Sequence, residues 1–380
     1  MFIMSTSPAP WTPTYTITPA IARGLMTIEA AKAVVSEVPI PPAVEAELRR
    51  RARIRSTHYS TRIEGNRLTL AEAERVIEGR QTEFHGRERD VGEVQNYWNA
   101  LLRVEAWAAK KLTLTEFSVY MLSSSVEGRA KPTPYRDGQN VIRDSRTGAI
   151  VFLPPEAKDV PALMAQMVAW AKLAEKNGLP VRLIAALVHY QFVTIHPYYD
   201  ENGRTARLIA TFLLHRGGYG LNGFFSLEEH HARDLDGYYQ ALVTHPHHNY
   251  YEGRAEAVLT GWVEYFIRLT SRVFELAKDE ALRCAREGIP AESDELRKLD
   301  RRARMVLGLF AKKEAITAAD VAKLLGLSDR MARNLMLEWV AAGWLVVLEA
   351  SRRSRSYGLS AIYRQYVGSL SAMGEYDQSQ

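Results

Sequence analysis

Residues 189–207, HYQFVTIHPYYDENGRTAR, constrain the fold of this chain more than any other stretch. Upstream of His196 the apolar residues recur at helical spacing, which predicts a helix with one buried face that ends at His196. The residue before a proline avoids the α conformation, so Pro197 places His196 at a partly exposed junction of helix and loop. An Asn-Gly turn follows, and a second helix is predicted from Arg204. The free N–H groups of its first turn attract an anion.

The polar side chains of this stretch combine a base, a metal ligand and anion binders. His196 has an unperturbed pKa near ~6.5, so it can take a proton from a hydroxyl at neutral pH. Asp200 offers a hard oxygen to a Mg²⁺ ion that keeps waters and takes ligands from substrate phosphates. The residues expected to converge on a polyphosphate are Asn202, Gly203, Arg204 and Arg207. Each residue alone could be an ordinary cap or turn, but together they favour nucleotidyl transfer.

The order of these residues resembles the signature of the Fic family (Fic/Doc proteins), His-Pro-Phe-x-Asp/Glu-Gly-Asn-Gly-Arg-x-x-Arg. The chain has Tyr198 for the Phe and Glu201 for the first Gly, and the other literal positions agree. The resemblance implies transfer of AMP from ATP, with Mg²⁺, to a Ser, Thr or Tyr hydroxyl of a target protein or of the chain itself. It also implies that Arg204 binds the inner phosphates and Arg207 the terminal one.

Glu201 is the main departure from that signature. A carboxylate beside a phosphate site repels the anion that the site should bind. Two interpretations follow: either the side chain of Glu201 points outward, or the donor or the placement of its phosphates differs from the family pattern.

A second informative stretch is Ser60-Thr61-Arg62-Ile63-Glu64-Gly65. Ser60 and Glu64 share one face of a helix, and Gly65 ends it. The stretch resembles the inhibitory motif of Fic proteins, Ser/Thr-x-x-x-Glu-Gly/Asn. That resemblance implies that Glu64 pairs with Arg207 and withdraws it from the terminal phosphate, which gives autoinhibition. In some family members the same Glu positions water to remove AMP, so a de-AMPylating activity is an alternative. A Glu beside a helix-ending Gly is also common in unrelated proteins.

The N-terminal region gives weaker signals. Residues 1 to about 40 are rich in Pro and Thr, and we expect a loose arm there. Pro41-Pro42 opens a predicted helix that runs to Tyr59. Its arginines are Arg49, Arg50, Arg51, Arg53 and Arg55. They could form a nucleic-acid patch, but a solvated helix face is the favoured interpretation.

Two further segments lie on either side of the signature. Residues 140–143 and 149–152 predict a β-hairpin, because turn residues separate two apolar runs. Its position resembles the flap on which Fic proteins dock a target's backbone as an added strand, with Val141 and Ile142 as docking residues. A plain hairpin that closes the core is the alternative. After the signature, Tyr239 lies in a segment that resembles the helix covering the nucleotide, although an aromatic on a helix is more often part of the core.

A change of composition at residues 288–293 marks a boundary. Beyond it, three predicted helices and a strand pair resemble a winged helix. Its DNA-binding candidates are Arg330, Arg333, Asn334 and Arg353. Winged helices also serve as protein docking or dimer surfaces. A competing function is therefore a DNA-binding regulator whose Fic-like core only senses a nucleotide.

Composition sets broad limits on this chain of 380 residues. The apolar content of 47%, the charged content of 24% and the net charge of +5 are those of an ordinary soluble protein. A single cysteine, Cys284, and the lack of a signal-peptide pattern or long apolar run predict a cytoplasmic protein without a membrane partner. A homodimer is compatible with the family resemblance.

The predicted fold class is mainly α: a Fic-type helical bundle with a β-hairpin flap, plus a C-terminal winged helix-turn-helix domain. The expected divisions are residues 1–110 (arm and inhibitory helix), 111–287 (Fic catalytic core), 288–300 (linker), 301–368 (winged helix) and 369–380 (tail).

Overall fold

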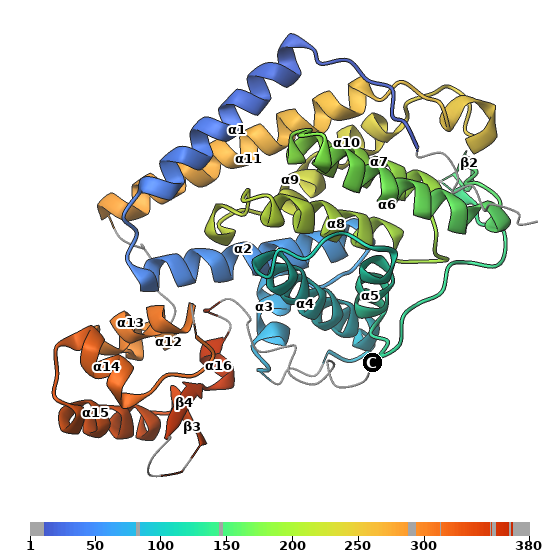
Figure 1. Ribbon diagram of the computed structural model, residues 1–380. Helices are drawn as coiled ribbons and strands as arrows, with labels where there is room; N and C mark the ends of the chain where they lie inside the picture. Colours follow the sequence, from blue (N-terminus) through green and yellow to red (C-terminus); the bar gives the residue numbers. More distant parts are fainter. Residues whose placement is uncertain are drawn as a thin grey trace, which may run out of the picture.

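The structure is a computed structural model that describes residues 11–80, 84–143, 147–287, 294–311, 313–349, 351, 355–364 and 366–367. These residues are mainly helical, as predicted, and they form a large helical bundle and a smaller C-terminal part (Figure 1). Among them, no helix is both long enough and apolar enough to cross a membrane.

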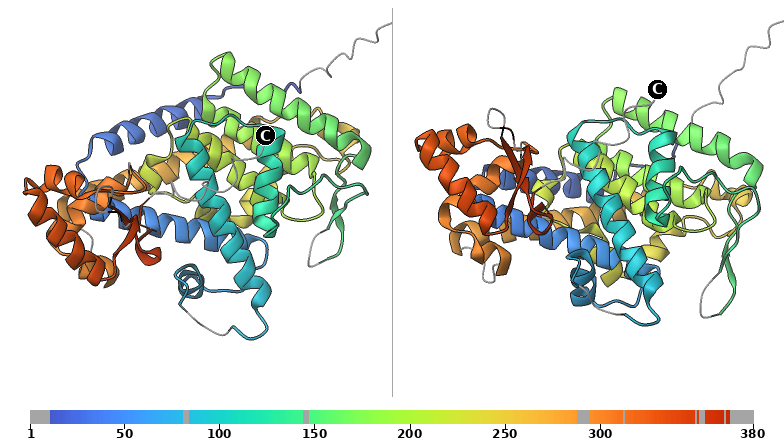
Figure 2. Two further views of the ribbon diagram at one scale, coloured as in Figure 1. Left: turned by 60° about the horizontal axis from the view of Figure 1, so that its bottom comes forward. Right: turned by 90° about the horizontal axis from the view of Figure 1, so that it is seen from below.

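The bundle is built from eleven helices of the described chain and one hairpin. The helices are α1 (Pro19–Glu37), α2 (Pro42–Ile63), α3 (Leu70–Ile77), α4 (Glu88–Ala109), α5 (Glu116–Glu127), α6 (Val160–Lys176), α7 (Val181–Ile195), α8 (Asn202–Arg216), α9 (Leu227–Arg233), α10 (Leu235–Leu242) and α11 (Thr260–Glu287). Short helical turns are η1 (Ala157–Asp159), η2 (Leu221–Gly223) and η3 (Tyr250–Arg254). The predicted hairpin consists of β1 (Ile142–Arg143) and β2 (Ile150–Phe152), which pair antiparallel and project from the bundle (Figure 2).

Helices α7 and α8 form the centre of the bundle and pack against each other. A helix that is apolar on every side must be buried, and residues 182–192 of α7 are all buried. Trp262 of α11 anchors α7 from one side, because its indole N–H donates to the carbonyl of Ala186 at 2.7 Å. The loop between α7 and α8 therefore starts and ends on rigid, buried elements, which suits a site that must hold side chains in fixed positions.

Residues 19–37 form helix α1, so the expectation of a loose arm is wrong for this segment. Thr18 caps the helix by accepting a hydrogen bond from the N–H of Ile21. The buried residues of α1 repeat at helical spacing: Ile21, Gly24, Ile28, Ala31 and Val35. They pack on α11, and Gly24 allows close approach, since a Cβ at that position would lie 2.6 Å from Ile267 Cγ2. Tertiary packing on α11 thus orders a segment whose own helical signal is weak.

The arginines of α2 also correct the sequence analysis. Arg50 is buried and contacts Glu74 and Glu78, and Arg53 is buried and donates to both oxygens of Glu105 at 2.9 and 2.6 Å. For these two residues the solvated-face interpretation is wrong, and they cannot form a nucleic-acid patch. The reason is that α2 lies between α3, α4 and α9, whose carboxylates make burial of the guanidinium groups tolerable.

The C-terminal part has its own small core. Its elements are α12 (Asp294–Lys298), α13 (Arg301–Leu307), η4 (Gly308–Ala311), α14 (Ala318–Leu325), α15 (Asp329–Ala341), β3 (Leu345–Glu349), β4 (Ser356–Leu359) and α16 (Ala361–Arg364). Thr317 and Ser328 cap α14 and α15 by accepting hydrogen bonds from the N–H groups of Asp320 and Met331. Helix α12 lies inside the predicted linker, and its Leu296 belongs to the C-terminal core. The order of elements matches the sequence analysis, while their assignment as a winged helix stays a prediction.

The C-terminal part packs against the N-terminal half of α2 (Figure 1). Ala46 of α2 is buried within the core of the C-terminal part. The guanidinium of Arg50 also lies over the ring of Tyr366, 5.6 Å from its centroid. Helix α2 is therefore shared between the two parts of the molecule.

Candidate active site between α7 and α8

His196 lies where the sequence predicted, at the end of α7. It is the C-cap residue and adopts a left-handed conformation with φ of +52°, which turns the chain into the loop. Its Nδ1 lies 3.3 Å from the carbonyl oxygen of Val193. Because a carbonyl only accepts, Nδ1 carries the proton and Nε2 keeps its lone pair. Burial lowers the pKa of His196 to about 4, so the ring is neutral at pH 7 and able to accept a proton.

The loop after His196 is closed by Asn202. Its Oδ1 accepts from the N–H of Tyr198 at 3.0 Å, and its Nδ2 donates to the carbonyl of Tyr198 at 2.8 Å. Tyr198 is buried and lies against the rings of Tyr135 and Phe192. The side chain of Asn202 thus holds the loop, and its position at the start of α8 brings its backbone to the anion-attracting end of that helix.

Arg207 is bound by the end of α2. Its guanidinium is only 2% exposed. Its Nε donates to Ser60 Oγ at 2.9 Å, and its Nη2 donates to the Ser60 carbonyl at 3.0 Å and to Glu64 Oε1 at 2.8 Å. Helix α2 ends at Ile63, and Gly65 takes a positive φ of +95°, so Ser60 and Glu64 meet Arg207 from one face of the last turn.

The carboxylate of Glu64 also lies on the first turn of α8. A Cβ placed on Gly203 would collide with Glu64 Oε1. Free N–H groups at a helix N-terminus attract an anion, and the carboxylate of Glu64 lies beside this end of α8. Glu64 therefore occupies the start of the predicted phosphate-binding segment, residues 202–207. Gly203 leaves space for its carboxylate because it has no side chain.

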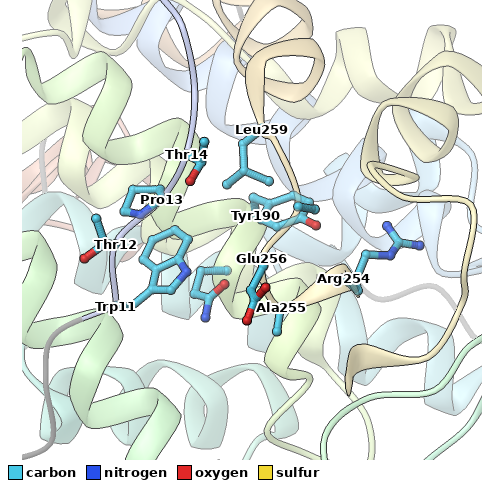
Figure 3. Close-up of a pocket in the computed structure, with 11 residues that line it drawn as sticks. Trp11, Thr12, Pro13, Thr14, Tyr190, Arg254, Ala255, Glu256 and Leu259 are labelled. Atoms are coloured by element: carbon cyan, nitrogen blue, oxygen red, sulfur yellow. The ribbon is translucent and has the colours of Figure 1, made fainter. Parts of the chain in front are cut away.

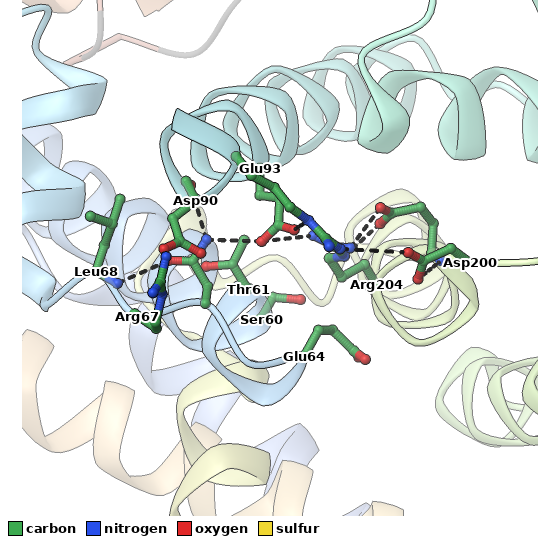
Figure 4. A network of polar contacts seen from close by, with 12 residues as sticks. Ser60, Thr61, Glu64, Arg67, Leu68, Asp90, Glu93, Asp200 and Arg204 are labelled. Carbon is green, nitrogen blue, oxygen red and sulfur yellow. Dashed lines mark hydrogen bonds and ion pairs between the residues drawn. The ribbon is translucent and has the colours of Figure 1, made fainter. Parts of the chain in front are cut away.

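Glu201 does not point outward, so that interpretation is wrong. Its side chain is 9% exposed, and its carboxylate accepts from Arg204 Nη2 at 2.6 Å while its other oxygen lies 2.5 Å from Arg204 Nε. Glu93 of α4 lies 3.5 Å from Arg204 on the other side (Figure 4). Burial raises the pKa of Glu201, although the charge of Arg204 opposes this shift. The two carboxylates hold Arg204 because a buried guanidinium needs anionic partners.

Asp200 is the candidate Mg²⁺ ligand, and its side chain is 67% exposed. One carboxylate oxygen accepts from the N–H of Glu201 at 2.7 Å, and the other lies 3.8 Å from Arg89 (Figure 4). Across the described residues, no group of three or more His, Cys, Asp or Glu could hold a metal by itself. A single exposed carboxylate fits Mg²⁺, which binds through one or two carboxylates together with waters and substrate phosphates.

The remaining predicted residues of the bundle lie at the edges of this site. Tyr239 is half-exposed on α10, where burial and the charge of Glu64 raise the pKa of its hydroxyl and the charge of Arg207 opposes the shift. Its neighbour Tyr238 is buried and contacts Nε2 of His189 at 3.0 Å. Val141 and Ile142 lie at the start of β1 and are partly buried.

Arg136, which was not predicted from the sequence, contacts the start of the loop between α7 and α8 directly. Its Nε donates to the carbonyl of His196 at 2.9 Å, and its backbone N–H donates to the carbonyl of Pro197 at 2.9 Å. Nothing in the local sequence, Thr-Pro-Tyr-Arg-Asp-Gly, marks this arginine as buried, because all its partners are backbone carbonyls.

A small pocket lies on another side of α7 and is separate from this site (Figure 3). Residues 11–14, 254–257 and 259 form its walls, together with Tyr190 and Gln191 of α7. None of the predicted site residues lines it.

In the C-terminal part, Arg330, Arg333 and Asn334 are exposed on α15, and Arg333 lies 3.8 Å from Asp329. Arg353 lies outside the described residues.

The fold and the site together define a helical protein in which a histidine at the end of α7, a short loop and the start of α8 form one polar site. An arrangement of this kind suits the binding of phosphate groups. The Fic/DOC family model matches residues 120–214. Residues 120–214 therefore match the Fic/DOC family, and for these residues the resemblance that the signature indicated is confirmed.

Known proteins resemble this chain over different lengths. It is 30% identical over 198 residues to "Protein adenylyltransferase Fic" of Drosophila grimshawi and 29% identical over 198 residues to that of Drosophila willistoni. Each match covers 52% of this chain, but only 40% and 39% of those relatives. Among solved structures, a Fic family protein from Desulfovibrio desulfuricans G20 matches with a TM-score of 0.58 and 24% identity over 92% of this chain and 99% of that chain.

A Fic domain containing signaling protein from Bacteroides thetaiotaomicron matches with a TM-score of 0.60 and 23% identity, over 72% of this chain and 99% of that chain. These likenesses establish the fold of the bundle.

Proposed function

We propose that this protein is an autoinhibited protein adenylyltransferase, which transfers AMP from ATP to a Ser, Thr or Tyr hydroxyl of a target protein or of itself. The Drosophila relatives are named protein adenylyltransferases, which supports the reaction. The proposed autoinhibition rests on the hydrogen bonds that Arg207 donates to Ser60 and Glu64 beside the first turn of α8.

In this proposal His196 is the general base. Its Nδ1–H is held by the carbonyl of Val193, so Nε2 faces the reaction as a neutral acceptor. Nε2 takes the proton of the acceptor hydroxyl, the oxygen attacks the α-phosphorus of ATP, and the bond to the leaving pyrophosphate breaks. Magnesium bound by Asp200 would neutralise charge on the phosphates. The N–H groups at the start of α8 and the guanidinium of Arg207 bind the phosphate oxygens.

Glu64 inhibits by occupying two groups that the nucleotide needs. It pairs with Arg207 at 2.8 Å and covers the first turn of α8. ATP then binds without its terminal phosphate in place, and its α-phosphorus is misaligned for attack. Removal of the carboxylate frees Arg207, which is buried and needs an anion.

The test compares four purified proteins with labelled ATP and Mg²⁺: the natural chain, Glu64→Gly, His196→Ala and the double variant. We expect label on protein to rise about tenfold or more with Glu64→Gly, since a charged hydrogen bond of about 1.5–3 kcal/mol is lost from the inhibited state. Label should vanish whenever His196 is replaced. Intact mass identifies the added group, and a mass other than that of AMP would reassign the donor. No rise with Glu64→Gly would refute inhibition by α2.

We further propose that the outer face of α15 contacts DNA. Arg330, Arg333 and Asn334 are exposed on the first turns of this capped helix, where a recognition helix meets base edges. Charge reversal of Arg330 and Arg333 should abolish salt-dependent retention on duplex DNA. Retention that does not respond to these substitutions would leave protein docking as the role of this face.

A further inference from the structure

Arg136 is a buried arginine whose partners are all carbonyl oxygens. It lies between α5 and β1, and its side chain is 3% exposed. Its guanidinium donates through Nε to His196 O at 2.9 Å, through Nη1 to Gly138 O at 2.9 Å, and through Nη2 to Pro155 O. One planar group thus joins three separate points of the backbone.

Burial of a guanidinium is costly, and neutral carbonyls offset that cost less well than carboxylates do. The position of Arg136 explains how it is accommodated. The carbonyl of His196 follows the last turn of α7, where helix carbonyls lack intrahelical partners and the macrodipole favours a positive charge. Arg136 satisfies this carbonyl and so fixes the backbone of His196 in its left-handed conformation with φ of +52°.

The other two carbonyls belong to the two ends of the flap. Gly138 precedes β1, and Pro155 follows β2, so both strands leave the bundle from points held by Arg136. Further contacts tie the same segments together. Tyr199 donates to Asp137 Oδ1 at 2.7 Å, and Asn140 donates to the carbonyl of Tyr198 at 3.3 Å. The base of the flap and the loop carrying His196 therefore form one bonded unit.

We propose that Arg136 is a positioning residue that fixes His196 relative to the base of the flap, so that an acceptor segment docked on the flap meets an aligned base. The inference rests on the proposed function, because it assigns His196 as the base and the hairpin as the docking strand. It adds to that function the residue that couples the two.

The charge of Arg136 has a second effect on His196. Burial is the largest cause of the lowered pKa of His196, and the nearby guanidinium lowers it further, against the hydrogen bond to Val193. Loss of Arg136 should therefore both loosen the ring and make it easier to protonate.

The test uses the full chain carrying Glu64→Gly, into which Arg136→Met and Arg136→Lys are introduced. We expect Arg136→Met to lower kcat for AMP transfer about 100-fold, since a displacement of about 1 Å at a base costs that much. The dissociation constant for ATP, measured by calorimetry, should stay within about twofold. Arg136→Lys keeps the charge and one bond, so it should recover part of kcat. Equal losses in ATP binding and kcat, or an unchanged kcat, would overturn the inference.

Arg216→Met is the matched control. Arg216 is also a buried arginine that donates to a carbonyl, that of Leu112 at 3.4 Å, but it lies at the far end of α8. Its loss should lower the melting temperature without changing kcat. If Arg136→Met fails to fold, Arg136→Lys decides the question with the same two readouts.

One measurement does not depend on AMP transfer, so it tests the role of Arg136 separately from the proposed function. If the Glu64→Gly parent transfers no AMP, the proposed function fails. NMR titration of the His196 ring then tests the coupling: its pKa should rise in Arg136→Met and stay near the parental value in Arg136→Lys. An unchanged pKa in both variants would refute contact between the guanidinium and the base.

Discussion

Replacement of Glu201 by Gln removes the negative charge that this carboxylate carries above its raised pKa of about 8, and it keeps the size of the side chain. In the structure both oxygens of Glu201 contact Arg204, at 2.6 and 2.5 Å, and the pair is almost fully buried. Arg204 is the arginine proposed for the inner phosphates, so an internal anion now takes the place that a phosphate oxygen would take. Gln can still accept one hydrogen bond, but it neither neutralises Arg204 nor repels a nucleotide.

The size of the effect follows from simple electrostatics. A like charge about 6 Å from a phosphate costs roughly 3 kcal/mol at an effective permittivity of about 20. Asp200 beside it is largely exposed, so water reaches the site and screens part of this repulsion. About 1.4 kcal/mol should remain, which corresponds to about tenfold tighter binding of ATP.

Isothermal calorimetry with ATP and Mg²⁺ at pH 9, where Glu201 is ionised, measures this change, both in the natural chain and with Glu64→Gly. Glu175→Gln is the matched control, because Glu175 contacts Arg216 at the other end of α8 and its loss removes a carboxylate far from the nucleotide. We expect the control to leave the dissociation constant unchanged. Unchanged or weaker binding with Glu201→Gln would refute the idea that Glu201 competes with phosphate for Arg204.

Three further outcomes are expected. Because the pKa of His196 is lowered to about 4, kcat/KM of the Glu64→Gly variant should stay level from pH 8 to roughly 5 and fall only as the ring gains a proton near that pKa; an acidic limb near ~6.5 would contradict the neutral, buried base. Ser60→Ala should raise labelling of the otherwise natural chain by roughly fivefold, less than Glu64→Gly, since Arg207 loses one hydrogen bond of about 1 kcal/mol. Arg53→Met should lower the free energy of unfolding by about 3–5 kcal/mol, because its carboxylate partner stays buried and unpaired; denaturant unfolding that shows a loss below ~1 kcal/mol would contradict this value.

Short-range patterns allowed much of the site to be predicted. The end of α7 at His196 and the shared face of Ser60 and Glu64 depend on neighbours within a few residues, and the structure has them as expected, while α8 starts at Asn202, two residues before the predicted Arg204. Proline, glycine and helical spacing carry this information in the chain itself.

Pairings between distant residues were not predictable in the same way. Arg50 and Arg53 looked like a solvated face because their carboxylates lie on α3 and α4, between 24 and 52 positions along the chain. Arg136 has only backbone carbonyls as partners, and these carry no sequence signal. The side chain of Glu201 turned inward because Arg204 is buried, which depends on the packing of the whole bundle.

Helix α2 begins in the hydrophobic core of the C-terminal part and ends beside the candidate active site. Its residue Ala46 is enclosed by the C-terminal part, whereas Glu64 follows its last turn and holds Arg207. A shortened protein without residues 294–380 would expose Ala46 and take Tyr366 away from Arg50. Any activity gained by such a truncation would thus result from a loosened anchor of α2, the helix proposed to inhibit, as much as from the loss of the C-terminal part itself.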